Sequence, residues 1–258
     1  TLAESSAVAE FAARSQKTAG GHVGVAGVSV GGTLALLTAA DPRLQQRISV
    51  VACVAPFGDL REVMRLATTG SYRDGERLAR HVPPPYLRIG LARSLAAMLP
   101  ATPSTAALCR ELRALATTDS AVDLPAQAFR DAGPDAESVF ALLENTNPAQ
   151  FDVLYDALPS DVRAAVVSLS PVRMAELLRA PVEIATAPQD AYFPLSQARA
   201  LVAASPRVRL TITSLLAHAT PRLSAAYLAE LRRLDAFFVR ALRAAATGPG
   251  YTPRQETT

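Results

Sequence analysis

The chain carries the pattern Gly-x-Ser-x-Gly, with Gly27, Ser29 and Gly31 at its fixed positions. An apolar run, residues 22–28, leads into the serine, and a run of good helix formers, residues 33–40, follows it. A serine on so tight a strand-to-helix turn has strained dihedrals, and the two glycines give the turn room. Its hydroxyl lies at a helix N-terminus, where backbone N–H groups stabilise negative charge. The pattern predicts a nucleophilic serine, and a serine that only caps the helix is the alternative.

This turn resembles the nucleophile elbow of the alpha/beta-hydrolase family, in which a serine, an acid and a histidine follow in that chain order. The sequence has three histidines. His218 follows a late apolar run, residues 209–216, in the place where the family keeps its general base. His22 precedes the far end of the serine strand, and His81 opens a proline-rich loop. The resemblance implies His218 as the base, and an ordinary hydrogen-bonded loop histidine is the alternative.

The acid that the resemblance implies is Asp190. It comes shortly after the apolar run 182–187, with a proline four residues later, as in the acid-bearing loop of the family. Asp59 competes for the role because it follows another apolar run, residues 47–56, at a position that some family members use. An aspartate that only shapes its turn is the alternative for Asp190.

The resemblance also implies a reaction. Ser29 would attack a carbonyl carbon, His218 would take and return the proton, and Asp190 would orient the imidazole and stabilise its charge. The backbone N–H of Val30 would be one donor of the oxyanion hole, and Tyr192 is a candidate pocket residue. This implies hydrolysis of a carboxylic ester, a small-molecule ester or acyl substrate, and no metal or organic cofactor.

The apolar runs predict an α/β fold, with a mostly parallel sheet flanked by helices and a helical insertion. Four strands are expected, at residues 22–28, 47–56, 182–187 and 209–216. We expect a core with the elbow over residues 1–65, a helical cap over 66–170, the rest of the core over 171–246, and a disordered tail over 247–258. The cap would shape the acyl pocket and exclude water. A helical subdomain that only adds stability is the alternative.

Only one predicted helix, residues 2–16, precedes the serine strand, whereas family members place several strands before the elbow. We therefore expect the chain to correspond to the second half of the family's fold. The strand at residues 22–28 would then form an exposed edge, which invites pairing with another chain. The second oxyanion donor of the family comes from an earlier loop, and its loss would lower the rate by about 10²–10³.

Composition excludes several functional classes. Half of the 258 residues are hydrophobic, which indicates a globular chain. The net charge is +3, but the basic residues, all arginines except Lys17, are spread among acids without the basic block that nucleic-acid binding favours. Cys53 and Cys109 fit no metal or redox spacing. No apolar run reaches the roughly 18–20 residues of a membrane helix, so we expect no membrane segment in this chain and a cytoplasmic location.

Two further functions are consistent with the same residues. An acyltransferase could use the same three residues and pass the acyl group to an alcohol or amine. A non-catalytic chain could keep the fold for binding or assembly. The sequence does not predict an oligomeric state.

Overall fold

The structure, a computed structural model, describes residues 1–15, 21–115, 123–217, 220–221 and 228–247. The predicted base His218 lies outside the described residues, and so does the predicted tail over residues 247–258 except for residue 247, which is helical. The chain divides into two compact units. One contains Thr1–Asp59 and Ser170–Thr258, and the other contains Leu60–Leu169.

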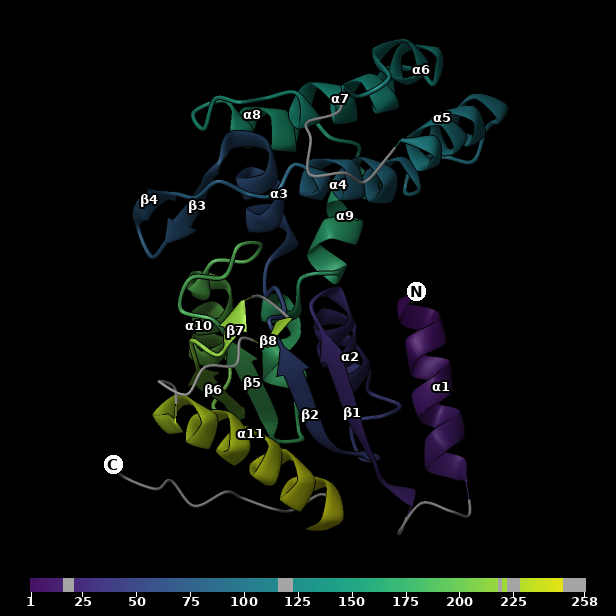
Figure 1. Cartoon of the computed structure of the whole chain (residues 1–258). Helices are drawn as coiled ribbons and strands as arrows, with labels where there is room; N and C mark the ends of the chain where they lie inside the picture. Colours follow the sequence, from purple (N-terminus) through teal and green to yellow (C-terminus); the bar gives the residue numbers. More distant parts are fainter. Residues whose placement is uncertain (16–20, 116–122, 218–219, 222–227, 248–258) are drawn as a thin grey trace. The chain divides into compact units, whose positions relative to one another are not determined.

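The described part of the first unit is built on a four-stranded sheet (Figure 1). Its strands, in spatial order, are β1 (Val23–Val28), β2 (Ile48–Val54), β5 (Val182–Thr186) and β6 (Val208–Ile212). All three neighbouring pairs are parallel, so the carboxyl ends of the strands meet at one edge of the sheet. The predicted α/β fold class, with its four strands, is confirmed.

Helices cover both faces of this sheet (Figure 1). They are α2 (Val30–Ala40), the 3-10 helix η2 (Pro171–Leu177) and α10 (Leu195–Ala204) on one face, and α11 (Leu228–Thr247) on the other. The alternation of side chains along β2 accounts for the two layers. Val51 and Cys53 pack toward α2, whereas Val50 packs against Ala241 and Ala244 of α11. The remaining helix, α1 (Leu2–Arg14), packs against α2.

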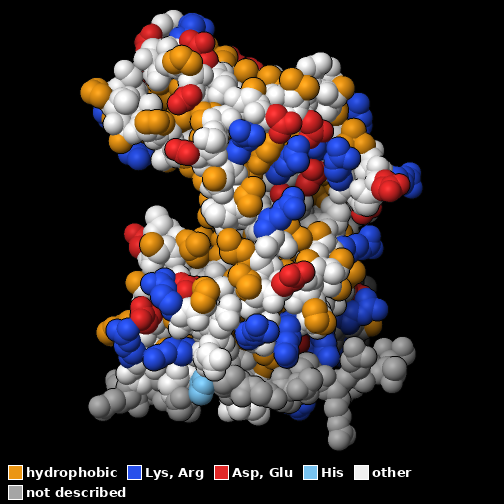
Figure 2. All heavy atoms as spheres, turned by 180° about the vertical axis from the view of Figure 1, so that it is seen from behind, with side chains coloured by type: hydrophobic (Ala, Val, Ile, Leu, Met, Phe, Trp, Pro, Cys, Tyr) orange, Lys and Arg blue, Asp and Glu red, His pale blue; other side chains and the backbone are white. Residues whose placement is uncertain are grey.

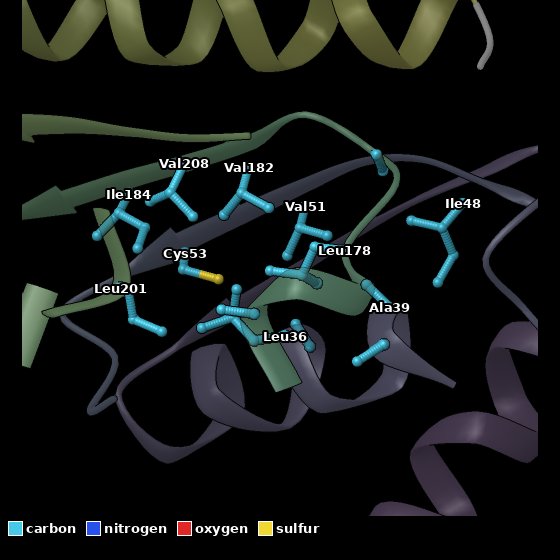
Figure 3. Close-up of a cluster of buried hydrophobic side chains, with 14 of the residues drawn as sticks. Leu36, Ala39, Ile48, Val51, Cys53, Leu178, Val182, Ile184, Leu201 and Val208 are labelled. Atoms are coloured by element: carbon cyan, nitrogen blue, oxygen red, sulfur yellow. The ribbon is translucent and has the colours of Figure 1, made fainter. Parts of the chain in front are cut away.

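The main hydrophobic core fills the space between the sheet and α2 (Figure 3). Leu36 of α2, Ile184 of β5 and Leu201 of α10 meet there, and all three side chains are fully buried. Burying an aliphatic side chain of this size stabilises the fold by about 1.5–3 kcal/mol. The core therefore fixes α2, and with it the turn that precedes α2, against the strands.

A buried ion pair joins the opposite face of the sheet to α11. Arg240 of α11 donates from Nε to Glu183 Oε2 at 2.9 Å, and from a second nitrogen to Thr211 Oγ1 at 2.9 Å. The Glu183 side chain is only 4% exposed, so Arg240 is the ion-pair partner of a carboxylate that is almost fully buried. The pair fixes α11 across β5 and β6.

β1 lies at the edge of the sheet in the described part of the chain, as the sequence predicts. Its side chains alternate between half-buried and exposed, and Val28 is 50% exposed. An open groove of about 470 Å³ lies beside the strand, lined by residues of α1 such as Val8 and Ala9 and by Val25 of β1. The unpaired backbone groups of such an edge can accept a further strand.

The second unit is mainly helical. Its described elements are α3 (Leu60–Thr69), β3 (Ser71–Asp74), β4 (Arg77–Arg80), α4 (Tyr86–Ala96), α5 (Pro103–Ala114), α6 (Ala126–Asp131), α7 (Pro134–Leu143), α8 (Phe151–Asp156) and α9 (Ser160–Ser168). The antiparallel pair of β3 and β4 was not predicted. Its signal in the sequence is Asp74-Gly75, a turn pair in which Gly75 takes a φ of 62°. The role of this unit as a cap stays a prediction.

Asp152 of α8 forms ion pairs with arginines of the second unit. Its carboxylate accepts hydrogen bonds from Arg61 at 2.7 Å and from Arg65 at 2.6 Å, both on α3. Burial pushes the pKa of Asp152 upward, but the Arg65 hydrogen bond and the neighbouring arginine charges outweigh it, so its pKa lies below the ordinary value. Because Arg65 also lies over the Phe151 ring, 4.2 Å from its centroid, α3 and α8 are joined by charge and by packing.

Candidate functional site

Ser29 lies on the turn between β1 and α2 with a strained backbone. Its φ is 54° and its ψ is −126°, and a positive φ is rare for any residue other than glycine. Such a conformation costs on the order of 1–3 kcal/mol and persists only where the surroundings enforce it. Here the Ser29 N–H donates to the Val54 carbonyl at 2.8 Å, and the Ser29 carbonyl accepts from Gly32 at 2.9 Å and from Thr33 at 3.2 Å. These bonds hold the turn from both sides.

The side chain of Ser29 does not serve the helix that follows it. Ser29 occupies the N-cap position of α2, yet its side chain makes no capping hydrogen bond. Capping is the ordinary reason for a serine at a helix start. The alternative that Ser29 merely caps the helix is therefore not supported by the structure.

The glycines of the turn differ in their steric need. A Cβ on Gly27 would lie 2.2 Å from the Gly31 carbonyl oxygen and 2.3 Å from its carbon. A Cβ on Gly32 would lie 3.1 Å from the Gly27 oxygen and 3.3 Å from the Cβ atoms of Cys53 and Pro56. A Cβ on Gly31 would meet no non-neighbouring atom of the described residues within 4 Å. The steric requirement therefore falls on Gly27, which belongs to the Gly-x-Ser-x-Gly pattern, and on Gly32, which does not. It does not fall on Gly31.

The start of α2 gives this turn a positive electrostatic environment. Val30 and Gly31 begin the helix, and the first N–H groups of a helix have no partner within it. No acidic residue stands in the first turn of α2. The helix dipole and these N–H groups can stabilise an anion beside Ser29. The role of the Val30 N–H as an oxyanion donor stays a prediction.

Asp190 lies in the loop after β5 and is 1% exposed. Its Oδ1 accepts hydrogen bonds from the backbone N–H groups of Tyr192 at 2.8 Å and Phe193 at 2.9 Å. Charge-assisted bonds of this kind fix the orientation of the carboxylate. The same bonds also form a local turn, so the role of Asp190 as the acid stays a prediction. Tyr192 is half-buried next to it.

The competing acid Asp59 has a different environment. Its carboxylate is 18% exposed and lies 3.7 Å from the Arg173 guanidinium. A carboxylate that already faces an arginine is a poorer candidate for orienting a histidine than one held by backbone N–H groups. The choice of Asp190 over Asp59 as the acid stays a prediction.

The topology brings the serine and the predicted acid to the same edge of the sheet. Ser29 follows β1 and Asp190 follows β5, and β2 lies between these two parallel strands. Of the other histidines, His22 lies at the opposite end of β1 from Ser29, and His81 lies in the second unit after β4. The position of His218 is outside the described residues.

Cys53 of β2 contacts the start of α2, so its thiol is an alternative nucleophile to consider. Its thiol is fully buried and donates to the Gly32 carbonyl oxygen at 3.3 Å. Burial raises the pKa of the Cys53 thiol far above its ordinary value, so it stays protonated and unreactive. Cys53 therefore acts as a packing residue. Among the described residues, no three His, Cys, Asp or Glu side chains are grouped as metal ligands would be.

The charges visible in Figure 2 are mixed in sign. Arginine side chains lie among acidic and apolar ones on this face. None of the helices in the described part of the chain combines the length and the apolar character that crossing a bilayer requires.

No family model matches the chain, and no curated protein sequence matches it. Solved structures that it resembles include a meta-cleavage product hydrolase from Pseudomonas fluorescens, 16% identical with a TM-score of 0.36 over 85% of this chain and 64% of that protein. An alpha/beta fold family hydrolase from Bacillus anthracis is 13% identical with a TM-score of 0.37, over 84% of this chain and 66% of that one. A proline iminopeptidase from Mycobacterium smegmatis is 17% identical with a TM-score of 0.37, over 88% of this chain and 67% of that one.

The chain therefore spans slightly less than two thirds of the length of the first two of these proteins, at 64% and 66%. At identities of 13–17% the likeness concerns the fold alone.

Proposed function

We propose that this chain carries the nucleophile of a serine hydrolase of the alpha/beta-hydrolase type, which cleaves a carboxylic ester through an acyl-enzyme on Ser29. The observation that carries the proposal is the turn at Ser29. It combines a φ of 54° and a ψ of −126° with a side chain that makes no capping bond to α2. Strain of this kind is typical of functional sites, where it presents a reactive group.

The proposed reaction begins when Ser29 Oγ attacks the ester carbonyl carbon while His218 takes the hydroxyl proton. The carbonyl oxygen becomes an oxyanion at the N-terminus of α2, where the Val30 N–H donates to it. The C–O bond to the leaving alcohol then breaks, and His218 returns the proton to that alcohol. Water attacks the acyl-enzyme by the same route and releases the acid. Asp190 orients the imidazole and stabilises its charged form.

The buried carboxylate of Asp190 supports this assignment of roles. Two backbone N–H groups hold its Oδ1, so the carboxylate has a fixed orientation before any partner is considered. A carboxylate of fixed orientation can hold an imidazole in one tautomer, which is what the acid of a serine triad provides. Parallel strands bring the Ser29 and Asp190 loops to one sheet edge, which also supports the proposal.

Hydrolysis of a p-nitrophenyl ester tests this function. Ser29→Ala and His218→Ala should each lower the rate by about 10³–10⁶, to the level that remains without the nucleophile or its base. His22→Ala is the matched control, because His22 lies at the far end of β1, and it should retain the wild-type rate. If Ser29→Ala retains the wild-type rate, Ser29 is not the nucleophile.

The same assay distinguishes hydrolysis from acyl transfer. An added alcohol that raises the rate of p-nitrophenol release and yields a new ester would identify an acyltransferase. An unchanged rate with free acid as the product supports the hydrolase. A folded wild-type chain without esterase activity would favour the binding protein instead.

A further inference from the structure

The segment 55–59, which joins β2 to α3, lies between the serine and acid loops and is bonded to both sides. It begins with a strained residue, since Ala55 has a φ of 49°. The Ala55 N–H donates to the Ala185 carbonyl of β5 at 2.8 Å, and the Ser29 N–H donates to Val54 at 2.8 Å. The end of β2 is therefore tied to the serine turn on one side and to β5 on the other.

Thr33 bonds this segment to the serine helix. Its hydroxyl donates to the Phe57 carbonyl oxygen at 3.1 Å and accepts from the Phe57 N–H at 3.1 Å. Thr33 is 1% exposed, and its own N–H donates to the Ser29 carbonyl. One buried hydroxyl thus satisfies both backbone groups of Phe57 and fixes them one helical turn from Ser29.

The Phe57 ring contacts the acid loop. It meets the Phe193 ring edge-on, with the centroids 5.4 Å apart and the planes at 67°. The Phe193 N–H in turn donates to Asp190 Oδ1 at 2.9 Å. Both rings are buried, at 7% and 5% exposure, so they cannot move apart without opening a cavity.

Gln197 holds the other end of the same segment. Its Oε1 accepts from the N–H groups of Gly58 at 2.9 Å and Asp59 at 2.8 Å. Gln197 is 5% exposed and lies in the first turn of α10, which begins directly after the acid loop. A side chain on Gly58 would lie 2.8 Å from the Gln197 carbonyl oxygen, so the segment and α10 are in close contact there.

We propose that Thr33 and Gln197 are positioning residues that set the placement of the Asp190 loop relative to Ser29, with segment 55–59 as the rigid spacer. This inference rests on the proposed function, because it concerns the serine and acid of that reaction. Neither side chain needs to touch a substrate. Each acts by satisfying buried backbone groups of the spacer, which would otherwise shift to find other partners.

The test measures the rate at which a fluorophosphonate modifies Ser29 at several concentrations of the reagent. These data give the maximal rate and the half-saturating concentration as separate quantities. Thr33→Val keeps the shape of the side chain but removes both hydrogen bonds to Phe57. It should lower the maximal rate about 10- to 100-fold, as expected for a misplacement of about 1 Å. Thr33→Ser restores the hydroxyl and should recover most of the rate.

Thr38→Val is the matched control. Thr38 lies on the same helix with 0% exposure, and its hydroxyl pairs with Ser5 of α1 at 2.8 Å, away from the spacer. It should lose a comparable amount of stability and keep the wild-type labelling rate. If Thr33→Val does not fold, Gln197 provides the same test at the other end of the spacer. Gln197→Met removes the oxygen that accepts from Gly58 and Asp59 and should lower the labelling rate, whereas Gln197→Glu keeps an acceptor oxygen and should retain most of it.

The outcomes separate the two proposals. If wild type is labelled at Ser29 and folded Thr33→Val is labelled equally fast, the positioning proposal is wrong and the proposed function stands. If Thr38→Val loses as much rate as Thr33→Val, the effect is one of general stability and the positioning proposal is again wrong. If folded wild type is not labelled, both proposals fail.

Discussion

The close packing of the Ser29 turn predicts that replacing Gly27 by alanine lowers both stability and reactivity. The Cβ of Gly27→Ala would lie 2.2 Å from the Gly31 oxygen and 2.6 Å from the Gly32 nitrogen, whereas ordinary contact begins at 3.4 Å. These atoms belong to the backbone of α2, so no side chain can rotate away to make room. The start of α2 must withdraw by about 1 Å, and the core packed on Leu36 opposes that movement.

Gly27→Ala should have two effects: overpacking lowers the stability of the chain, and misplacement of Ser29 lowers its reaction rate. Overpacking at a rigid site costs about 1–3 kcal/mol in the free energy of unfolding. Moving the helix start by about 1 Å relative to the strand shifts Ser29 and the Val30 N–H together, and such a shift can lower a reaction rate by about 10²-fold. Gly27→Ala should therefore lose both stability and reactivity.

Gly31→Ala is the control, because no non-neighbouring atom of the described residues lies within 4 Å of its Cβ position. Alanine is also the better helix former, by up to about 1 kcal/mol. Urea unfolding followed by circular dichroism compares the two variants, and fluorophosphonate labelling reports the reactivity of Gly27→Ala. If Gly27→Ala unfolds at the same urea concentration as Gly31→Ala and is labelled as fast as wild type, Gly27 is not in close contact with the backbone of α2 and the prediction is wrong.

Two further predictions concern buried carboxylates. Asp190→Asn should lower ester hydrolysis by about 10⁴-fold, as removal of a triad acid does, whereas Asp59→Asn should stay within about tenfold of wild type; the reverse order would make Asp59 the acid. Arg240→Met should lower the free energy of unfolding by about 3–5 kcal/mol, because it leaves the Glu183 carboxylate buried without its partner. The double variant Glu183→Leu with Arg240→Met removes that carboxylate as well and should recover most of the loss, as measured by thermal unfolding. A double variant no more stable than Arg240→Met would contradict this interpretation.

The sequence predicts the first unit well because its strands are short, apolar and bounded by turn residues. The sequence predicts strands at residues 22–28 and 182–187, and the structure has strands at Val23–Val28 and Val182–Thr186. Parallel strands buried on both faces give this signal most clearly. The predicted strand over residues 47–56 ends earlier, at Val54, because Ala55 turns into the left-handed region. Alanine gives no sequence signal for that conformation.

The site was only partly predictable. Gly-x-Ser-x-Gly locates the strained serine, but it treats its two glycines alike, and only the packing of α2 shows that Gly27 and Gly32 are the crowded positions. The bonds from Thr33 to Phe57 and from Gln197 to Gly58 join residues 24 and 139 positions apart, so no local pattern indicates them. They become visible only when the strands set the loops side by side.

Intact-mass analysis of the folded chain after treatment with a fluorophosphonate, with Ser29→Ala treated in parallel, decides whether Ser29 is an activated nucleophile. We expect one adduct per chain in the wild type and none in Ser29→Ala, and peptide mapping should place the wild-type adduct on Ser29. An adduct that persists in Ser29→Ala, or no adduct on a folded and monodisperse wild-type chain, would contradict the claim that the strained turn presents an activated nucleophile.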